Sequence, residues 1–132
     1  MSASWPYPSA APPEPLWFTS LAEAMPWAQT WDCPLVVVFA AHWCQWSLRL
    51  WAETLADVQV KAMLRTIACA WIEGDNNLQL LQQWGIDIYP TSLVLAPDGS
   101  ELGRIRGFEE GPAWATRLHE ILMGRGITRQ SR

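Results

Sequence analysis

Two runs of consecutive apolar residues stand out in the first half of the chain. Residues 34–40 (PLVVVFA) and 66–72 (TIACAWI) are almost wholly apolar, which is typical of strands buried on both faces. Between them, apolar residues recur at three- and four-residue spacing, at Leu48, Trp51, Ala52 and Leu55. This spacing predicts an amphipathic helix from Cys44 to Leu55, and residues 57–64 predict a further helical turn or two. Strands that alternate with helices predict an α/β fold.

Cap and turn signals delimit the remaining elements. The capping-box pattern Ser20–Glu23 predicts a first helix over residues 20–31, interrupted at Met25–Pro26. The later segments comprise a helix capped by Asn76 or Asn77 and ended by Gly85, a strand at 91–96, its hairpin partner at 101–108 and a closing helix at 111–123.

The two ends of the chain differ in composition from its centre. Residues 1–15 contain five prolines among small residues, so we expect an extended or disordered arm there. Residues 16–124 are expected to form one domain, and residues 125–132 a basic tail.

Charge and cysteine content narrow the functional classes. A net charge of -4 and a pI near 5.0 argue against a nucleic-acid partner. No stretch approaches the ~18 apolar residues of a membrane span, and the N-terminus lacks a secretory signal, so we expect a cytoplasmic protein. The chain has three cysteines, and this odd number argues against a disulfide framework. We expect at least one free thiol. No cysteine and histidine spacing predicts a metal site.

The sequence FAAHWCQWS joins the first apolar run to the helix that follows it, and Tyr89-Pro90-Thr91 precedes the strand at 91–96. Together these motifs resemble the thioredoxin-like superfamily over roughly residues 17–123. The W-C-x-W pattern is most similar to the WCxWC subgroup, with the second cysteine replaced by Ser47. The order of the predicted elements, a βαβ half followed by a ββα half, itself predicts a central four-stranded mixed sheet with helices on both faces. The resemblance implies that this sheet belongs to a thioredoxin-like fold. It also implies a cis Pro90 beside Cys44, whose exposed backbone edge pairs with an extended substrate peptide.

Two further positions depart from that family's pattern. Many thioredoxins carry a buried aspartate where this chain has Val38, and often a lysine where it has Trp71. With Ser47, these replacements remove the second thiol and the polar groups that serve it.

Cys44 retains a chemistry of its own. Its place before a helix favours the thiolate, which can attack a disulfide and form a mixed disulfide. Ser47, three residues on, is expected to offer its hydroxyl to that thiolate, but it cannot attack sulfur. Release therefore needs glutathione as a co-substrate, another protein thiol or a second thiol of the substrate. No other cofactor is expected.

The other cysteines are expected to stay out of this chemistry. Cys69 lies mid-strand and is interpreted as a small core residue. Cys33 lies at the opposite end of the strand from Cys44, about 30 Å of extended chain away, and is expected at the surface or half-buried.

The residues around Cys44 suggest a surface for a protein partner. His42 either tunes the thiol or faces solvent. At least one of Trp43 and Trp46 is expected to pack against the sheet, although both together would form an apolar collar. Tyr89 and Thr91 would extend the same patch beside Pro90. The sequence leaves the identity of the partner and the oligomeric state open.

Three interpretations follow. The first is a monothiol (CxxS) thiol-disulfide oxidoreductase or isomerase with Cys44 as nucleophile. The second is a redox-inactive thioredoxin-fold module that binds a protein through the aromatic surface. In the third, Ser47 is an engineered replacement that traps mixed disulfides in a WCxWC dithiol enzyme.

Overall fold

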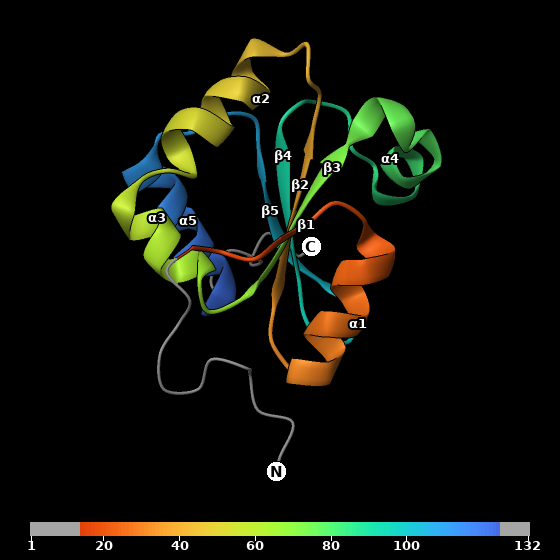
Figure 1. The fold of residues 1–132 in the computed structure, drawn as a ribbon, viewed down its shortest axis with the longest axis vertical. Helices are drawn as coiled ribbons and strands as arrows, with labels where there is room; N and C mark the ends of the chain where they lie inside the picture. The colour runs from red at the N-terminus through yellow and green to blue at the C-terminus, as the bar shows by residue number, and fades with distance from the viewer. Residues whose placement is uncertain (1–13, 125–132) are drawn as a thin grey trace.

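The computed structural model of the protein describes residues 14–124 (Figure 1). The elements of the first half are β1 (Trp17–Phe18), α1 (Leu21–Trp31), β2 (Leu35–Ala40), α2 (Gln45–Arg49), the π-helix η1 (Leu50–Thr54) and α3 (Val58–Leu64). Those of the second half are β3 (Ala68–Glu73), the 3-10 helix η2 (Gly74–Asn76), α4 (Leu78–Trp84), β4 (Thr91–Leu95), β5 (Glu101–Arg106) and α5 (Gly111–Leu122).

The strands form one mixed sheet in the order β1-β3-β2-β4-β5. The first three in that order run parallel to one another, whereas β4 is antiparallel to both β2 and β5. The central strand β2 is buried along its whole length, as its uninterrupted apolar sequence predicts.

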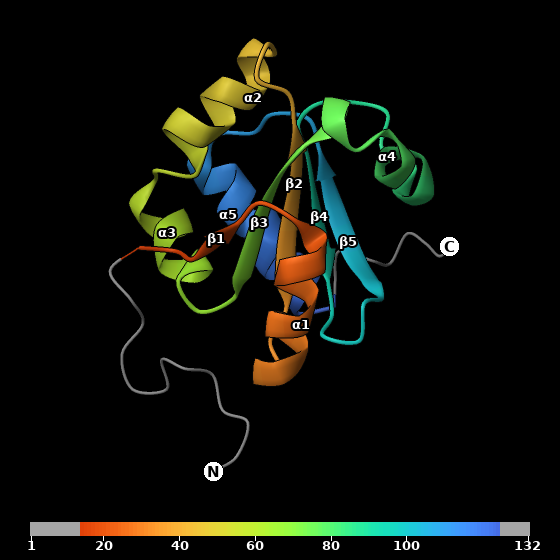
Figure 2. The same ribbon diagram turned by 45° about the vertical axis from the view of Figure 1, so that its right-hand side comes forward.

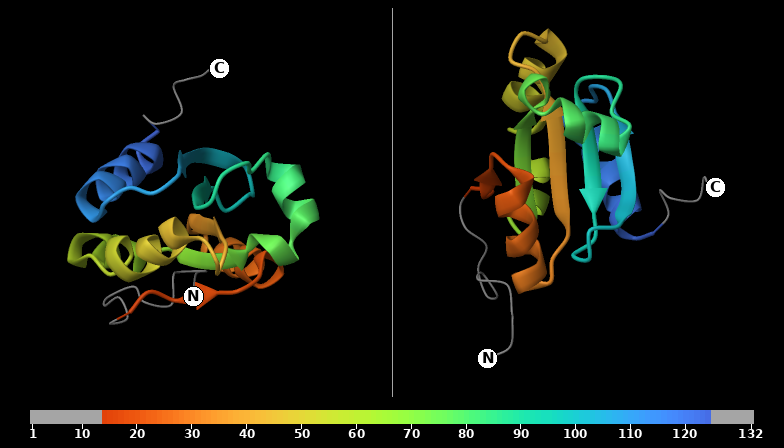
Figure 3. Two further views of the ribbon diagram at one scale, coloured as in Figure 1. Left: turned by 90° about the horizontal axis from the view of Figure 1, so that it is seen from above. Right: turned by 90° about the vertical axis from the view of Figure 1, so that its right-hand side faces the viewer.

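Helices cover both faces of this sheet (Figures 1 and 2). One apolar cluster joins α1 and α4 to the sheet face that carries Leu35, Val37 and Phe39. The other joins η1, α3 and α5 to the face that carries Val36 and Val38. The view from above shows the sheet running between the two helical layers (Figure 3). This α/β arrangement is the class that the alternating pattern predicts.

The sheet has five strands, so the prediction of four was wrong. The additional strand β1 pairs in parallel with β3, through Trp17 opposite Cys69 and Phe18 opposite Ala70. A two-residue strand is too short to show an alternating pattern in the sequence.

The predicted break at Met25–Pro26 is also absent, because α1 continues through Pro26 to Trp31. Proline removes the hydrogen bond that its nitrogen would donate to the carbonyl of Ala22. Ala22 is exposed in the first turn of the helix, so water can bond to that carbonyl instead.

The predicted helix from Cys44 to Leu55 is divided into α2 and the wider π-helical turn η1. The Leu55 N–H donates to the carbonyl of Leu50 at 2.8 Å, five residues back. The wider turn directs Thr54 inward, where its hydroxyl donates to the carbonyl of Glu109 at 2.5 Å. Periodicity alone does not reveal this contact with the β5–α5 loop.

Other predicted boundaries agree closely with the structure. Asp57 caps α3 by accepting from the Gln59 and Val60 amides, and Gly85 ends α4 in the left-handed conformation.

The predicted N-terminal arm and basic tail lie almost wholly outside the described residues.

The largest fully buried side chain is Trp114 of α5, whose indole donates to Ser92 Oγ of β4 at 3.2 Å. We predict that Trp114→Ala lowers the free energy of unfolding by about 3–5 kcal/mol, because it leaves a cavity and an unpaired hydroxyl. His119→Ala, on the exposed side of the same helix, should change it by less than about 0.5 kcal/mol. Urea unfolding measures both. Equal losses in the two variants would contradict this assignment of the core.

Candidate functional site

Strand direction brings two distant loops to one end of the sheet. Phe39, near the end of β2, is paired with Thr91, at the start of antiparallel β4. The chain that leaves β2 therefore meets the chain that enters β4. Cys44 follows the first and Tyr89 precedes the second, and the Cys44 Sγ lies 3.9 Å from the Tyr89 carbonyl oxygen. The Tyr89–Pro90 peptide bond is cis.

Cys44 is half-buried and is the N-cap residue of α2. Its own N–H donates to the Ala41 carbonyl at 3.0 Å, and its carbonyl accepts from Leu48 at 3.0 Å. The thiol thus stands ahead of a first helical turn whose N–H groups lack helical partners. The position is accessible and close to unpaired backbone donors.

Ser47 is fully buried, and its hydroxyl oxygen accepts a hydrogen bond from the Ala41 N–H at 3.2 Å. This bond ties the first turn of α2 to the end of β2. Among residues 14–124, the structure shows no hydrogen bond between Ser47 and Cys44. The expected hydroxyl–thiolate contact therefore stays a prediction.

Two carboxylates, Glu73 at the end of β3 and Asp75 in η2, hold the loop that contains His42 and Trp43. Glu73 Oε2 accepts from the backbone N–H of His42 at 3.2 Å and lies 2.9 Å from its Nδ1. Asp75 Oδ2 accepts from the Trp43 indole N–H at 2.6 Å. His42 and Trp43 are both exposed, so these contacts are what restrain their side chains.

Tyr89 completes the same cluster from the other loop. Its hydroxyl donates to Asp75 Oδ1 at 3.1 Å, and its ring lies edge-on to that of Trp43 with centroids 5.9 Å apart. Burial, followed by the bond to Asp75, raises the pKa of Tyr89 to about 12. Gly74 leaves room for the ring, since a Cβ there would lie 2.2 Å from the tyrosine hydroxyl oxygen.

Trp46 faces a different group of residues. Its ring lies 5.5 Å from that of Phe108, and the Arg49 guanidinium lies over both rings, at 5.2 and 4.6 Å. Arg49 also forms a two-pronged ion pair with Glu53. Trp46 is 43% exposed and Trp43 is 63% exposed. At least one of them was expected to pack against the sheet, but both are exposed, and their ring contacts are with Tyr89 and Phe108 in neighbouring loops.

A cleft of about 450 Å³ opens beside Cys44. Its walls are mainly apolar and are formed by Trp43, Cys44, Leu81, Ile86, Asp87, Ile88 and Tyr89. Asp87 contributes the one carboxylate, which is paired with Arg106 at 2.7 Å. The arrangement can take an apolar group next to the sulfur.

Pro90 and Thr91 form the floor of the site. Both are buried, and the Pro90 carbonyl accepts from the Gly107 N–H at 2.7 Å. The Thr91 hydroxyl donates to the Ile88 carbonyl at 2.7 Å, which braces the turn. The structure thus turns the Thr91 side chain away from the exposed patch.

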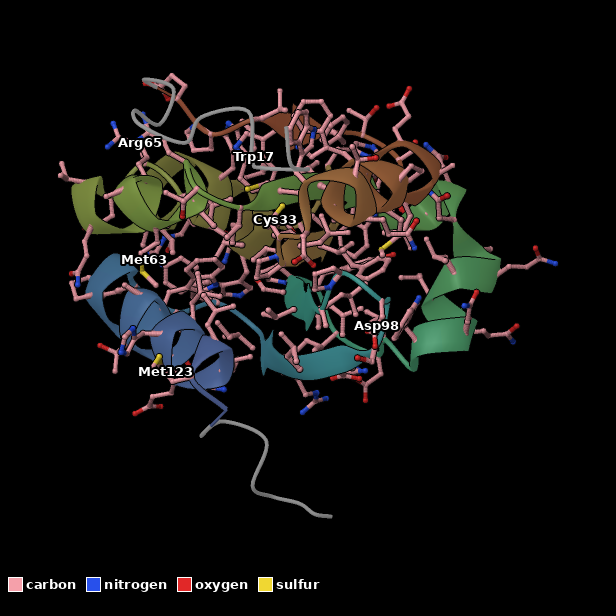
Figure 4. All side chains as sticks on the ribbon, turned by 90° about the horizontal axis from the view of Figure 1, so that it is seen from below. Trp17, Cys33, Met63, Arg65, Asp98 and Met123 are labelled. Carbon is pink, nitrogen blue, oxygen red and sulfur yellow. The ribbon has the colours of Figure 1, made fainter. Side chains whose placement is uncertain are left out.

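The other two cysteines are buried away from this site. Cys69 is fully buried in the core, as predicted, and burial raises the pKa of its thiol far above the usual range. Cys33 was expected at the surface or half-buried, but it is only 5% exposed. The turn that ends α1 brings the chain back to the sheet at Cys33, which lies in the interior (Figure 4). The Cys33 N–H donates to the carbonyl of Ala28 at 3.0 Å. Burial raises the pKa of Cys33 to about 11.

Val38 and Trp71, the two departures from the family pattern, are paired opposite each other in β2 and β3. Val38 is fully buried, and Trp71 packs against Trp17 and Trp51 with ring centroids 6.4 and 5.0 Å away. Both positions thus contribute to an apolar core.

Sequence reasoning missed Glu73, Asp75 and Phe108 as neighbours of the site. The acidic pair follows the second apolar run directly, at the same sheet edge as Cys44, and that position is a usable signal. Nothing in the sequence pattern marks Phe108, which reaches Trp46 from the loop before α5.

No protein-family profile matches the chain, and no curated protein matches it in sequence. Solved structures, however, share its fold. A thioredoxin from Thermus thermophilus is 20% identical, with a TM-score of 0.76 over 89% of this chain and 94% of the other. A structure described as DsbH oxidoreductase is 20% identical, with a TM-score of 0.73 over 86% and 88%. The reduced C-terminal domain of DsbD from Neisseria meningitidis is 24% identical, with a TM-score of 0.66 over 76% and 92%.

These similarities define a thioredoxin-like α/β fold. Within residues 14–124, no helix is long and apolar enough to cross a membrane. The same residues contain no cluster of three His, Cys, Asp or Glu side chains that could hold a metal ion.

We predict that iodoacetamide at pH 8 modifies Cys44 in the folded protein and leaves Cys33 and Cys69 unmodified. Both buried thiols have raised pKa values, so they stay protonated well above pH 8 as well as inaccessible. Peptide mass spectrometry resolves the three sites, and the urea-unfolded chain is the control in which all three react. Protection of Cys44 in the folded protein would contradict the accessible site described above.

Proposed function

We propose that the chain is a monothiol thiol-disulfide oxidoreductase in which Cys44 is the nucleophile. One observation carries the proposal: of the three cysteines, Cys44 alone is accessible, and it lies at a helix start against the Tyr89–Pro90 turn. The thioredoxin-like fold is consistent with it, and one structural neighbour is described as an oxidoreductase.

The reaction is a two-step exchange. The Cys44 thiolate attacks one sulfur of a substrate disulfide, a new disulfide forms between them, and the other substrate sulfur leaves as a thiolate that takes up a proton. A thiol from outside the chain then attacks the mixed disulfide, which transfers the substrate to that thiol and regenerates the Cys44 thiolate. Each step exchanges one disulfide for another, so no separate oxidant is needed.

An external thiol is needed because the chain offers no second accessible thiol. Ser47 occupies the resolving position, and its hydroxyl is buried and bonded to Ala41. Cys33 and Cys69 are buried on opposite faces of the sheet. Glutathione, a second protein thiol or another thiol of the substrate can serve, and glutathione is the proposed co-substrate.

The proposed partner is a protein disulfide that docks over Cys44 and Pro90. Trp43, Tyr89 and Ile88 offer apolar contacts on one side of the sulfur, and Trp46 offers a further one. An extended peptide is expected to pair with the backbone edge at Pro90. The cytoplasmic location expected from the sequence stays a prediction.

A second candidate is a redox-inactive module that binds a protein through the same surface. The exposed indoles of Trp43 and Trp46 favour it, as do the apolar Val38 and Trp71 in place of polar groups. The third interpretation, an engineered replacement at Ser47, shares the exchange chemistry of the first candidate and differs only in the origin of the serine.

The number of thiols released per chain from a disulfide-linked peptide dimer distinguishes the two candidate functions. Without any other thiol, the reduced protein should release one peptide thiol per chain and retain the other peptide on Cys44. Ser47→Cys should release two, because the new thiol resolves the mixed disulfide. Cys44→Ser should release none. If the protein and its Ser47→Cys variant both release none, the binding module becomes the better account.

A further inference from the structure

One carboxylate joins the two loops that flank Cys44. Asp75, in η2, accepts from the Trp43 indole N–H at 2.6 Å through Oδ2 and from the Tyr89 hydroxyl at 3.1 Å through Oδ1. Trp43 belongs to the loop after β2, and Tyr89 to the turn before β4. No strand pairing connects these two loops at Trp43 and Tyr89, so Asp75 supplies the hydrogen-bonded link between the two side chains, beside the contact of their rings.

The surrounding contacts leave this link little freedom. The Trp43 and Tyr89 rings meet edge-on with centroids 5.9 Å apart. The tyrosine ring also lies so close to Gly74 that any Cβ there would overlap it. The Tyr89 side chain is therefore confined by the backbone below it, by Trp43 beside it and by Asp75 at its hydroxyl.

The link matters most for Trp43, which is 63% exposed. An exposed side chain of this size normally samples several rotamers, and ordering it on substrate binding weakens affinity. Hydrogen bonds to an ionised carboxylate are stronger than those between neutral groups, so Asp75 is a suitable anchor. Trp43 and Tyr89 are both walls of the cleft beside Cys44.

We propose that Asp75 is a positioning residue that holds Trp43 and Tyr89 as preformed walls, and that it thereby favours protein disulfides over small disulfides at Cys44. The inference rests on the proposed exchange reaction. A peptide that extends beyond its disulfide contacts both walls, whereas a small disulfide reaches the sulfur without them. Preformed walls therefore lower KM for the larger substrate and leave the reaction at sulfur unchanged.

Two substitutions at Asp75 differ in the hydrogen bonds that they keep but not in charge. Asp75→Asn and Asp75→Ala both remove the negative charge, but only the amide can still accept from Trp43 and bond to the Tyr89 hydroxyl. With glutathione as the releasing thiol, Asp75→Ala should raise KM for a peptide disulfide about tenfold relative to Asp75→Asn, with kcat within about twofold. Exchange with 2-hydroxyethyl disulfide should be equal in the two variants.

The Trp43 indole N–H resonance, assigned with Trp43→Phe, tests the link without any activity. It should move and exchange faster with solvent in Asp75→Ala, and keep most of its protection in Asp75→Asn. Equal KM values for the peptide in the two Asp75 variants, or an indole resonance that Asp75→Ala leaves unchanged, would overturn the proposal. If no variant exchanges either disulfide while the indole resonance responds as expected, the proposed reaction fails and the specificity role fails with it, but the structural link stands.

Discussion

The site depends on the two-sided pairing of β2. This strand runs parallel to β3 on one side and antiparallel to β4 on the other. Its C-terminal end therefore lies beside the end of β3 and the beginning of β4. These three strand ends place the parts of the site together. Cys44 comes after β2, Glu73 and Asp75 lie at and just beyond the end of β3, and the Tyr89–Pro90 turn leads into β4. Because β2 is buried along its length, a one-residue slip would cost its packing on both faces.

The same framework accommodates a serine at position 47. Ser47 satisfies the N–H of buried Ala41, and sulfur is a weaker acceptor than a hydroxyl oxygen at that position. Val38 and Trp71 pack into the layer beneath, where an isolated polar group would lack a partner. Ser47, Val38 and Trp71 are physically consistent with one another: each fits its surroundings, and none supplies a group that could resolve a mixed disulfide.

Much of this arrangement could be predicted from the sequence. The long apolar runs identify β2 and β3, and the motifs around Cys44 and Pro90 indicate the fold and the two loops that meet at the candidate site. Contacts between distant segments could not be predicted. The short strand β1 depends on pairing with β3, the π-helical turn accompanies a bond from Thr54 to Glu109, and the Trp43 indole bonds to Asp75 in a distant segment. Periodicity describes a segment by itself, whereas these features require its neighbour.

The lifetime of the mixed disulfide at Cys44 tests the central claim most directly. The reduced protein would be mixed with a peptide disulfide and followed by intact-mass spectrometry, first alone and then with glutathione. The account predicts a single peptide adduct on Cys44 that persists until glutathione discharges it. An absent adduct, or one that decays alone to a disulfide between Cys44 and Cys33 or Cys69, would contradict it.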